Sequence, residues 1–290
     1  MKRGVPTVGC RFQGRLMIHV VTAANRCLYA RQLLQMHRQR TKVFVEGMGW
    51  NRPVSDDGGE YDEGDDEHAT YLLSLSPTGD VERSMRVRKA SDWSVIGDVY
   101  PHFIGPDVAS VRNLDVWEMC RLYSMSGARE PEGFSRRGEL GLALIELAVQ
   151  QGIRRIVGMS ELYLVGPVMR SGWRMKVIGL PGNYGEGECV AVEVDACPAA
   201  VEEMREKLNI SGSMLLEINP GDPLAEIEPQ DAEAFLEAVR HLTPESRQLV
   251  TGITRTIAKI EQSEGVEAAI AAVERVRQVI GEGGNLKNDK

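Results

Sequence analysis

The sequence predicts an α/β fold in which helices flank a mixed β-sheet, and two observations carry this prediction. Two short strand-like segments, TYLLSLS at 70–76 and VERSMRVR at 81–88, are separated by the turn PTGD and predict a β-hairpin. Further along the chain, segments typical of strands and helices follow one another, which predicts a strand–helix–strand crossover. A hairpin followed by a crossover predicts a mixed sheet, with antiparallel and parallel strands, and helices packed beside it.

The individual elements follow in chain order. A strand at 18–21 leads into a helix over about 25–41, in which apolar residues recur among polar ones at helical spacing. After the hairpin we expect a strand at 115–125 and a helix that contains Leu140, Leu144 and Leu147. The remaining order is strand 154–160, helix 162–172, strands 174–180 and 188–196, and helix 198–208.

Only helical patterns follow after residue 210, at 231–242, from Thr243 onward and at 266–280. Residues 211–290 hold 8 Lys and Arg against 14 Asp and Glu, so they carry −6 of the total charge of −8. We therefore expect an N-terminal extension (1–16), a main domain (17–209) and an acidic, all-helical C-terminal extension (210–290). The apolar stripes of the last helices need a cover, which leaves open a homo-oligomer formed through them.

The composition excludes several classes of protein. No apolar run approaches the roughly 18 residues that span a bilayer, and the basic start lacks a signal-peptide core, so we expect a cytoplasmic protein without a membrane anchor. The net charge of −8 argues against nucleic-acid binding. The five cysteines and five histidines have no metal-binding or redox spacing, so we expect no metal. Met17 is an alternative start to Met1.

Standard catalytic signatures are absent: the sequence has no GxxxxGK[ST], GxGxxG or GxSxG motif, so covalent serine catalysis is unsupported. The segment SRRGELG at 135–141 stands at an expected helix start, where amide groups beside Arg136 and Arg137 offer a site for an anion. A solvated basic helix start explains the same residues equally well.

A dispersed set of charged and aromatic residues gives a more specific signal. Taken singly, each has an ordinary explanation, such as a core aromatic or a surface ion pair. Their order and spacing closely resemble the LuxI-type acyl-homoserine-lactone synthases, the autoinducer synthase family of bacterial quorum sensing. The similarity covers about residues 17–209 and includes VMRSGWRMKVIG and VAVEVD. The residues that carry it are Arg40-TKV-Phe44-VEGMG-Trp50, Asp62-EG-Asp65, Arg86 and Glu118-MC-Arg121.

The resemblance implies an N-acetyltransferase-like (GNAT) three-layer fold with an all-helical C-terminal extension. It also implies transfer of an acyl group, from acyl carrier protein or coenzyme A, to the amine of S-adenosylmethionine. Lactonisation and release of methylthioadenosine follow, and S-adenosylmethionine is a substrate rather than a cofactor. The chain departs from the family at Tyr100, where Phe is usual, and near Ser160 and Glu161, where Thr is usual.

Roles for individual residues follow from the same resemblance. Phe44 and Trp50 are expected to contact adenine or the sulfonium, and Arg40 or Arg121 to hold the carboxylate. Glu118 is the candidate base that takes the amine proton, directly or through water. The catalytic set is Glu118, Arg40, Asp62, Asp65, Arg86 and Arg121, and the S-adenosylmethionine set is Phe44, Trp50, Arg40, Asp62, Tyr100 and Arg121.

Glu118 and Arg121 stand three apart in an expected strand, where side chains alternate between the two faces. A regular strand would point them in opposite directions. We therefore predict a β-bulge at Met119 or Cys120, which would bring both to one site.

The acyl chain is expected to enter beside the crossover helix, past Tyr100, Ser160, Leu164, Val168, Met169 and Trp173. An acidic carrier protein would need a basic dock, for which the candidates are Arg136, Arg137, Arg154, Arg155, Arg174 and Lys176. Ordinary core packing explains each acyl-pocket residue equally well.

Two other functions stay open. The chain could be an N-acyltransferase of the same fold that acylates another amine. It could also be an inactive regulatory member whose acidic helical tail binds a partner.

Overall fold

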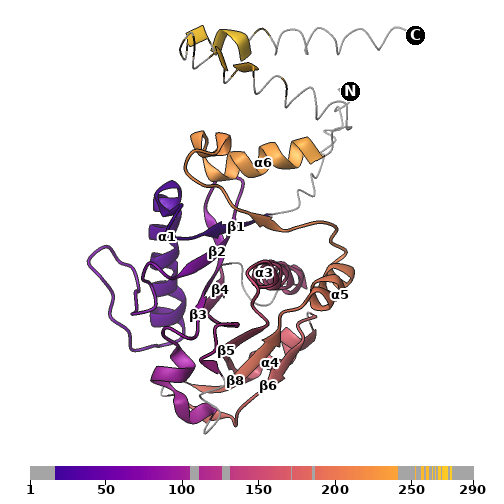
Figure 1. Ribbon diagram of the computed structural model, residues 1–290. Coiled ribbons are helices and arrows are strands. Elements are labelled where there is room, and N and C mark those ends of the chain that lie inside the picture. The colour runs from indigo at the N-terminus through magenta and orange to yellow at the C-terminus, as the bar shows by residue number, and fades with distance from the viewer. Residues whose placement is uncertain are drawn as a thin grey trace, which may run out of the picture. The chain divides into compact units, whose positions relative to one another are not determined.

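The computed structural model describes residues 17–104, 111–125, 131–170, 172–184 and 187–240, and scattered residues between 252 and 275. A nine-stranded sheet runs through the molecule in the order β6-β8-β5-β4-β3-β2-β1-β9, and β7 pairs with β8 (Figure 1). The strands are β1 (Ile18–Val21), β2 (Thr70–Leu75), β3 (Val81–Lys89), β4 (Val116–Ser124), β5 (Arg155–Glu161), β6 (Met175–Val177), β7 (Gly182–Asn183), β8 (Glu188–Asp195) and β9 (Leu215–Leu216).

Five described helices accompany the sheet: α1 (Ala30–Arg40), α3 (Pro131–Gln150), α4 (Leu162–Arg170), α5 (Pro198–Leu208) and α6 (Pro229–Arg240). The ends of α5 follow from its sequence, because Pro198 suits the first helical position and Asn209 adopts the left-handed conformation that ends a helix. Short helical turns lie at Arg26–Tyr29, Thr41–Gly47, Val95–Val99, Pro101–Phe103 and Pro223–Glu226. Thr41–Gly47 continues α1 directly and carries Phe44.

Each face of the sheet has its own apolar core. Leu72 belongs to the same apolar cluster as Leu144 of α3 and Met204 of α5, whereas Leu73 belongs to a second cluster with Met36 of α1. Successive strand residues point to opposite faces, so one alternating strand supplies both cores. Figure 1 shows the resulting layers, with α1 on one side of the sheet and α3 with α5 on the other. The predicted three-layer α/β fold with a mixed sheet is confirmed.

The middle of the sheet opens where β4 and β5 stop pairing. These parallel strands are joined from Val116↔Arg155 to Met119↔Gly158, after which β4 continues to Ser124 and β5 to Glu161. The backbone of the two free ends does not form a shared ladder. The helix α3 forms the crossover connection from β4 to β5, as the sequence predicts.

The strand β4 contains a bulge beside this opening. Arg86 of β3 pairs with Cys120, but Ser84 pairs with Tyr123, so β4 has one extra residue at this point. Arg121 takes a left-handed backbone conformation there, with φ of 54°. The predicted bulge is present, but it lies at Arg121 and Leu122 rather than at Met119 or Cys120.

The compact body continues past the boundary that we expected at residue 209. One compact unit comprises Met1–Ala234 and a second comprises Phe235–Lys290. The strand β9 pairs in parallel with β1, so the segment after 210 is not all-helical as predicted. A two-residue strand has no periodicity that the sequence could reveal. The expected helices from Thr243 and at 266–280 lie largely outside the described residues.

Glu233 of α6 joins this later segment to the first strand. Its carboxylate accepts a hydrogen bond of 2.7 Å from the amide of Met17 and lies 3.2 Å from Nε2 of His19. His19 is fully buried, and its other ring nitrogen lies 3.1 Å from the hydroxyl of Tyr29. A truncation that removes the helical tail must therefore keep residues 210–234. In the described part of the chain, no helix combines the length and apolar character needed to cross a membrane.

Replacing Glu233 by alanine should destabilise the body, because the buried Met17 amide and the His19 ring each lose a hydrogen bond to its carboxylate. We expect a loss of about 1–3 kcal/mol in the free energy of unfolding, measured by urea denaturation. The exposed Glu226→Ala serves as a control and should change the stability by less than about 0.5 kcal/mol. Equal stability of the two variants would show that Glu233 does not stabilise the body.

Candidate active site

Six charged side chains form a buried ion-pair network between α1, the acidic loop and the sheet. Arg40, at the end of α1, holds two of the acids: its Nη2 lies 2.5 Å from Glu60 Oε2, and its Nη1 lies 2.7 Å from Asp65 Oδ1. Three cations face three anions, which makes burial of the guanidinium groups tolerable. The members are Arg40, Arg86, Arg121, Glu60, Asp62 and Asp65.

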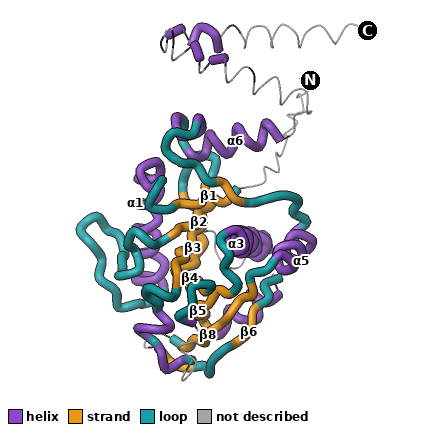
Figure 2. The backbone as a smooth tube through the Cα atoms, viewed as in Figure 1, coloured by secondary structure: helices purple, strands orange, loops and turns teal. Residues whose placement is uncertain are grey.

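Two arginines of the sheet hold the same loop from the other side. Arg86 of β3 pairs with Asp62 and lies 2.8 Å from Asp65 Oδ1. Arg121, in the bulge of β4, lies 2.7 Å from Glu60 Oε1 and 2.6 Å from Asp62 Oδ2. The long loop between the helical turn at Thr41–Gly47 and β2, which has almost no regular structure, is therefore fixed by its acids (Figure 2).

The acids of this network carry charge in spite of their burial. Burial raises the pKa of the Asp65 carboxyl, but its contacts with Arg40 and Arg86 outweigh that effect and hold the pKa below its ordinary value. Burial likewise raises the pKa of Glu60, and Arg121 together with Arg40 lowers it further than burial raises it. Self-repulsion within the acidic loop is thus offset by the arginines.

An aromatic wall stands against Arg121. Phe44 and Trp50 stack with ring centroids 4.7 Å apart and an angle of 20° between their planes. The guanidinium carbon of Arg121 lies 5.1 Å from the centroid of Trp50 and 5.7 Å from that of Phe44. Arg121 thus belongs both to the ion-pair network and to this wall.

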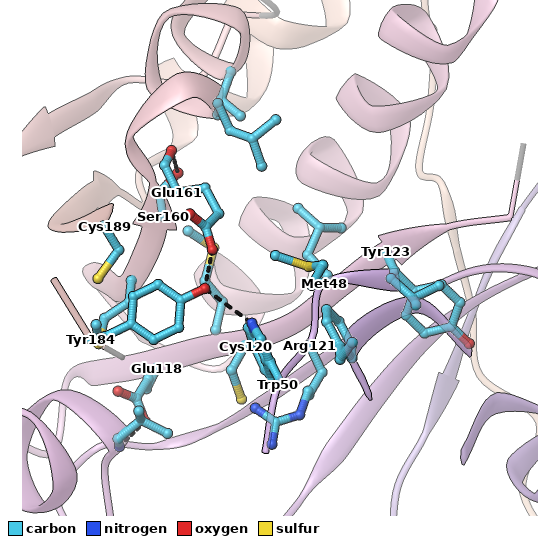
Figure 3. Close-up of a pocket in the computed structure, with 18 of the residues that line it drawn as sticks. Met48, Trp50, Glu118, Cys120, Arg121, Tyr123, Ser160, Glu161, Tyr184 and Cys189 are labelled. Atoms are coloured by element: carbon cyan, nitrogen blue, oxygen red, sulfur yellow. Dashed lines mark hydrogen bonds between the residues drawn. The ribbon is translucent and has the colours of Figure 1, made fainter. Parts of the chain in front are cut away.

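A cavity of about 390 Å³ occupies the opening between β4 and β5. Figure 3 shows Trp50 and Arg121 on one side of it and Ser160 and Glu161 on another. The lining is mostly apolar towards α4 and the later strands. Its apolar residues include Met119, Leu122, Met159, Leu164, Val168, Trp173 and Met175.

Glu118 also lines this cavity, but its carboxylate is held by a neighbouring turn. It accepts hydrogen bonds from the Ser94 hydroxyl at 3.1 Å, the Val95 amide at 2.6 Å and the Ile96 amide at 2.8 Å. Burial raises the pKa of Glu118, although these donors oppose the rise. Glu118 and Arg121 therefore line one cavity while binding different partners.

The expected acyl-pocket residues lie together with one exception. Tyr100, Ser160, Leu164, Val168 and Trp173 all line the cavity. Met169 does not, and half of its surface is exposed. On α4 it stands one residue after Val168, which turns it by about 100° around the helix axis. We therefore remove Met169 from the acyl pocket.

The expected dock residues are largely paired with acids. Arg154 lies 3.2 Å from Asp115, Arg155 lies 3.2 Å from Glu193 and Lys176 lies 2.7 Å from the same Glu193. Arg174 pairs with Glu203. Pairing reduces the positive charge that these residues present to an acidic partner. The side chains of Arg136 and Arg137 lie outside the described residues.

Three site residues escaped sequence analysis. Glu60 is fully buried and bridges Arg40 and Arg121, but it looks like any other member of an acidic run. Ser94 and Tyr184 belong to no recognisable motif. No group of three or more potential metal ligands occurs among the residues that the structure describes.

The sheet topology and the cavity together define a class of protein. A mixed sheet that opens between two parallel strands joined by a crossover helix is the architecture of N-acetyltransferase-like enzymes. The opening holds an apolar cavity with a charged end. The fold and the cavity are thus those of the N-acetyltransferase-like class.

Comparison with known proteins gives the family. The autoinducer synthase family model matches residues 25–204, and the chain belongs to this family. Isovaleryl-homoserine lactone synthase of Bradyrhizobium diazoefficiens is 28% identical over 202 residues, which cover 67% of this chain and 86% of that protein.

Two solved structures are similar to this chain. The structure of MesI, a CoA-dependent acyl-homoserine lactone synthase, has a TM-score of 0.58 and 29% identity, and covers 68% of this chain and 98% of its own. The structure of BjaI, a CoA-dependent acyl-homoserine lactone synthase, with SAM and isopentyl-CoA has a TM-score of 0.62 at 24% identity. It covers 76% of this chain and 99% of its own, and it supports the fold.

Glu60→Gln should destabilise the protein, because it removes one of three buried negative charges that face three guanidinium groups. We expect a loss of about 3 kcal/mol in the free energy of unfolding, measured by urea denaturation. Glu63→Gln, in the same loop but exposed, is the matched control and should lie within about 0.5 kcal/mol of the wild type. A Glu60→Gln protein as stable as the control would exclude a stabilising role for the network.

Proposed function

We propose that this chain makes an acyl-homoserine lactone, the signal molecule of quorum sensing. It transfers an acyl group from a thioester to the α-amine of S-adenosylmethionine and then closes the methionyl part into a lactone, with release of methylthioadenosine. The observation that carries the proposal is a single cavity that runs from an arginine and aromatic end to an apolar end. Membership of the autoinducer synthase family supports the same function.

The charged end suits S-adenosylmethionine. Arg40 is fully buried behind Glu60 and Asp65, so it supports the loop, whereas Arg121 lines the cavity. Within the described residues, the polar contacts of Arg121 use Nε and Nη2, which leaves the Nη1 donors for the substrate carboxylate. The faces of Phe44 and Trp50 offer stacking and cation–π contacts to the adenine or the sulfonium.

The apolar end suits an acyl chain, for which we propose acyl-coenzyme A as the donor. The similar structures of MesI and BjaI are both described as CoA-dependent. Because Arg154, Arg155 and Lys176 are paired with acids, this surface presents less positive charge to an acidic carrier protein. Acyl carrier protein is the alternative donor, and both belong in the assay.

The chemistry begins with an amine whose ordinary pKa of about 7.7–8.0 keeps it partly protonated. Glu118 accepts this proton, through a water because its carboxylate already binds the turn at Ser94–Ile96. The free amine attacks the thioester carbonyl, the carbon–sulfur bond breaks, and the donor leaves as a thiol after its sulfur takes the second amine proton. Amides along the edges where β4 and β5 diverge stabilise the oxyanion. The methionyl carboxylate then attacks its own γ-carbon and expels methylthioadenosine.

The test is incubation of the full chain with S-adenosylmethionine and a panel of acyl-coenzyme A and acyl carrier protein donors. We expect lactone, free thiol and methylthioadenosine in equal amounts, measured by mass spectrometry and a thiol assay. Acylation of another amine without methylthioadenosine would identify a different N-acyltransferase. No methylthioadenosine with any donor would contradict the proposal.

Glu118→Gln should lower the turnover number by about a hundredfold or more, since the variant cannot accept the amine proton. S-Adenosylmethionine should still bind, as measured by calorimetry. The exposed Glu188→Gln is the control and should keep wild-type turnover. Wild-type turnover in Glu118→Gln would remove the assignment of Glu118 as proton acceptor.

A further inference from the structure

Three side chains from separate segments form a hydrogen-bond chain across the cavity. The indole Nε1 of Trp50 donates to the hydroxyl of Tyr184 at 3.0 Å, and that hydroxyl donates to Glu161 Oε1. Figure 3 shows both bonds as dashed lines. Trp50 follows the helical turn at Thr41–Gly47, Tyr184 lies between β7 and β8, and Glu161 ends β5. The chain joins the aromatic wall to the acyl side of the cavity.

The local structure holds Tyr184 in one orientation. Its ring lies edge-on to Trp50, with centroids 6.1 Å apart, and edge-on to Tyr100 at 6.4 Å. Its amide donates to the carbonyl of Gly187 at 3.1 Å. A Cβ atom at Gly187 would lie 3.2 Å from Glu161 Oε2, so the glycine lets the turn approach the carboxylate. Burial, followed by the bond to Glu161, raises the pKa of Tyr184, so the phenol keeps the proton that it donates.

Trp50 needs this support on its polar edge. Phe44 and the guanidinium of Arg121 contact the indole ring, and such contacts tolerate sliding in the plane of the ring. A hydrogen bond from Nε1 is directional and removes that freedom. Tyr184 is therefore the partner that sets where the edge of the indole lies.

We propose that Tyr184 and Glu161 are positioning residues that hold Trp50 in place for S-adenosylmethionine, although both line the acyl part of the cavity. The proposal rests on the proposed function and deepens it. Glu161 accepts a hydrogen bond from Tyr184, and Tyr184 accepts one from Trp50. The binding of the nucleoside substrate depends on both hydrogen bonds. The other explanation is that both residues only form a wall for the acyl group.

The two explanations differ in which substrate binds more weakly when the hydrogen bonds of Tyr184 are lost. Tyr184→Phe keeps the ring and deletes both hydrogen bonds. We expect its dissociation constant for S-adenosylmethionine, measured by calorimetry without any acyl donor, to rise about tenfold. The KM for the acyl donor should stay within about twofold of the wild type. Tyr61→Phe is the matched control, because it also removes a phenol–carboxylate bond, to Asp57, outside this cavity.

Substitutions of Glu161 test the hydrogen bond that it accepts from Tyr184. Glu161→Gln keeps an oxygen that accepts from Tyr184 and should bind S-adenosylmethionine nearly as well as the wild type. Glu161→Ala should resemble Tyr184→Phe. Thermal unfolding of each variant checks that the fold is intact.

Unchanged S-adenosylmethionine binding in a folded Tyr184→Phe protein would overturn the proposal, whether or not the KM for the donor changes. Equal weakening in Glu161→Gln and Glu161→Ala would also overturn it, because acceptance of the hydrogen bond would then not be the cause. Failure of the proposed function has a different readout. It would appear as wild-type protein that releases no methylthioadenosine, a result that does not depend on the Tyr184 or Glu161 variants.

Discussion

The buried pairing of three arginines with three acids is the interaction on which the rest of the site depends. A loop with so many acidic residues repels itself in water, and three buried guanidinium groups without partners would be costly to fold. Together they are neutral, and each guanidinium gains directional hydrogen bonds. The pairing brings α1, the loop and the sheet to fixed positions, which in turn places Phe44 and Trp50 beside Arg121.

The bulge in β4 shows how this network shapes the backbone. A left-handed conformation is unfavourable for arginine, and it persists only where the surroundings stabilise it. Glu60 and Asp62 provide that stabilisation by holding the Arg121 guanidinium. On the same strand, Glu118 holds the turn at Ser94–Ile96 through two amides and a hydroxyl. The ion-pair network holds β4 at Arg121, and the turn at Ser94–Ile96 holds it at Glu118. The cavity opens where β5 diverges from β4.

Much of this arrangement could be predicted from the sequence, because local patterns report local structure. The hairpin, the crossover and the order of the elements along the chain follow from periodicity, whereas Arg40, Asp65 and Arg121 are indicated by the resemblance to the autoinducer synthase family. The remainder depends on contacts between distant segments. The bulge position is set by pairing with β3, and β9 is too short to have a pattern. Glu60 became distinguishable from the other acids only once its two arginine partners were placed around it.

Arg121 explains why the site needs the geometry of arginine rather than a positive charge alone. Its planar guanidinium binds Glu60 and Asp62 through Nε and Nη2 and also lies over the rings of Trp50 and Phe44. A lysine has one compact ammonium group, which cannot offer both a bidentate contact to a carboxylate and a planar face to aromatic rings. One side chain thus links the acidic loop, the aromatic wall and the proposed carboxylate site. Because Glu60 and Asp62 hold the Arg121 guanidinium, the position of the acidic loop also sets the position of Arg121 beside the aromatic wall.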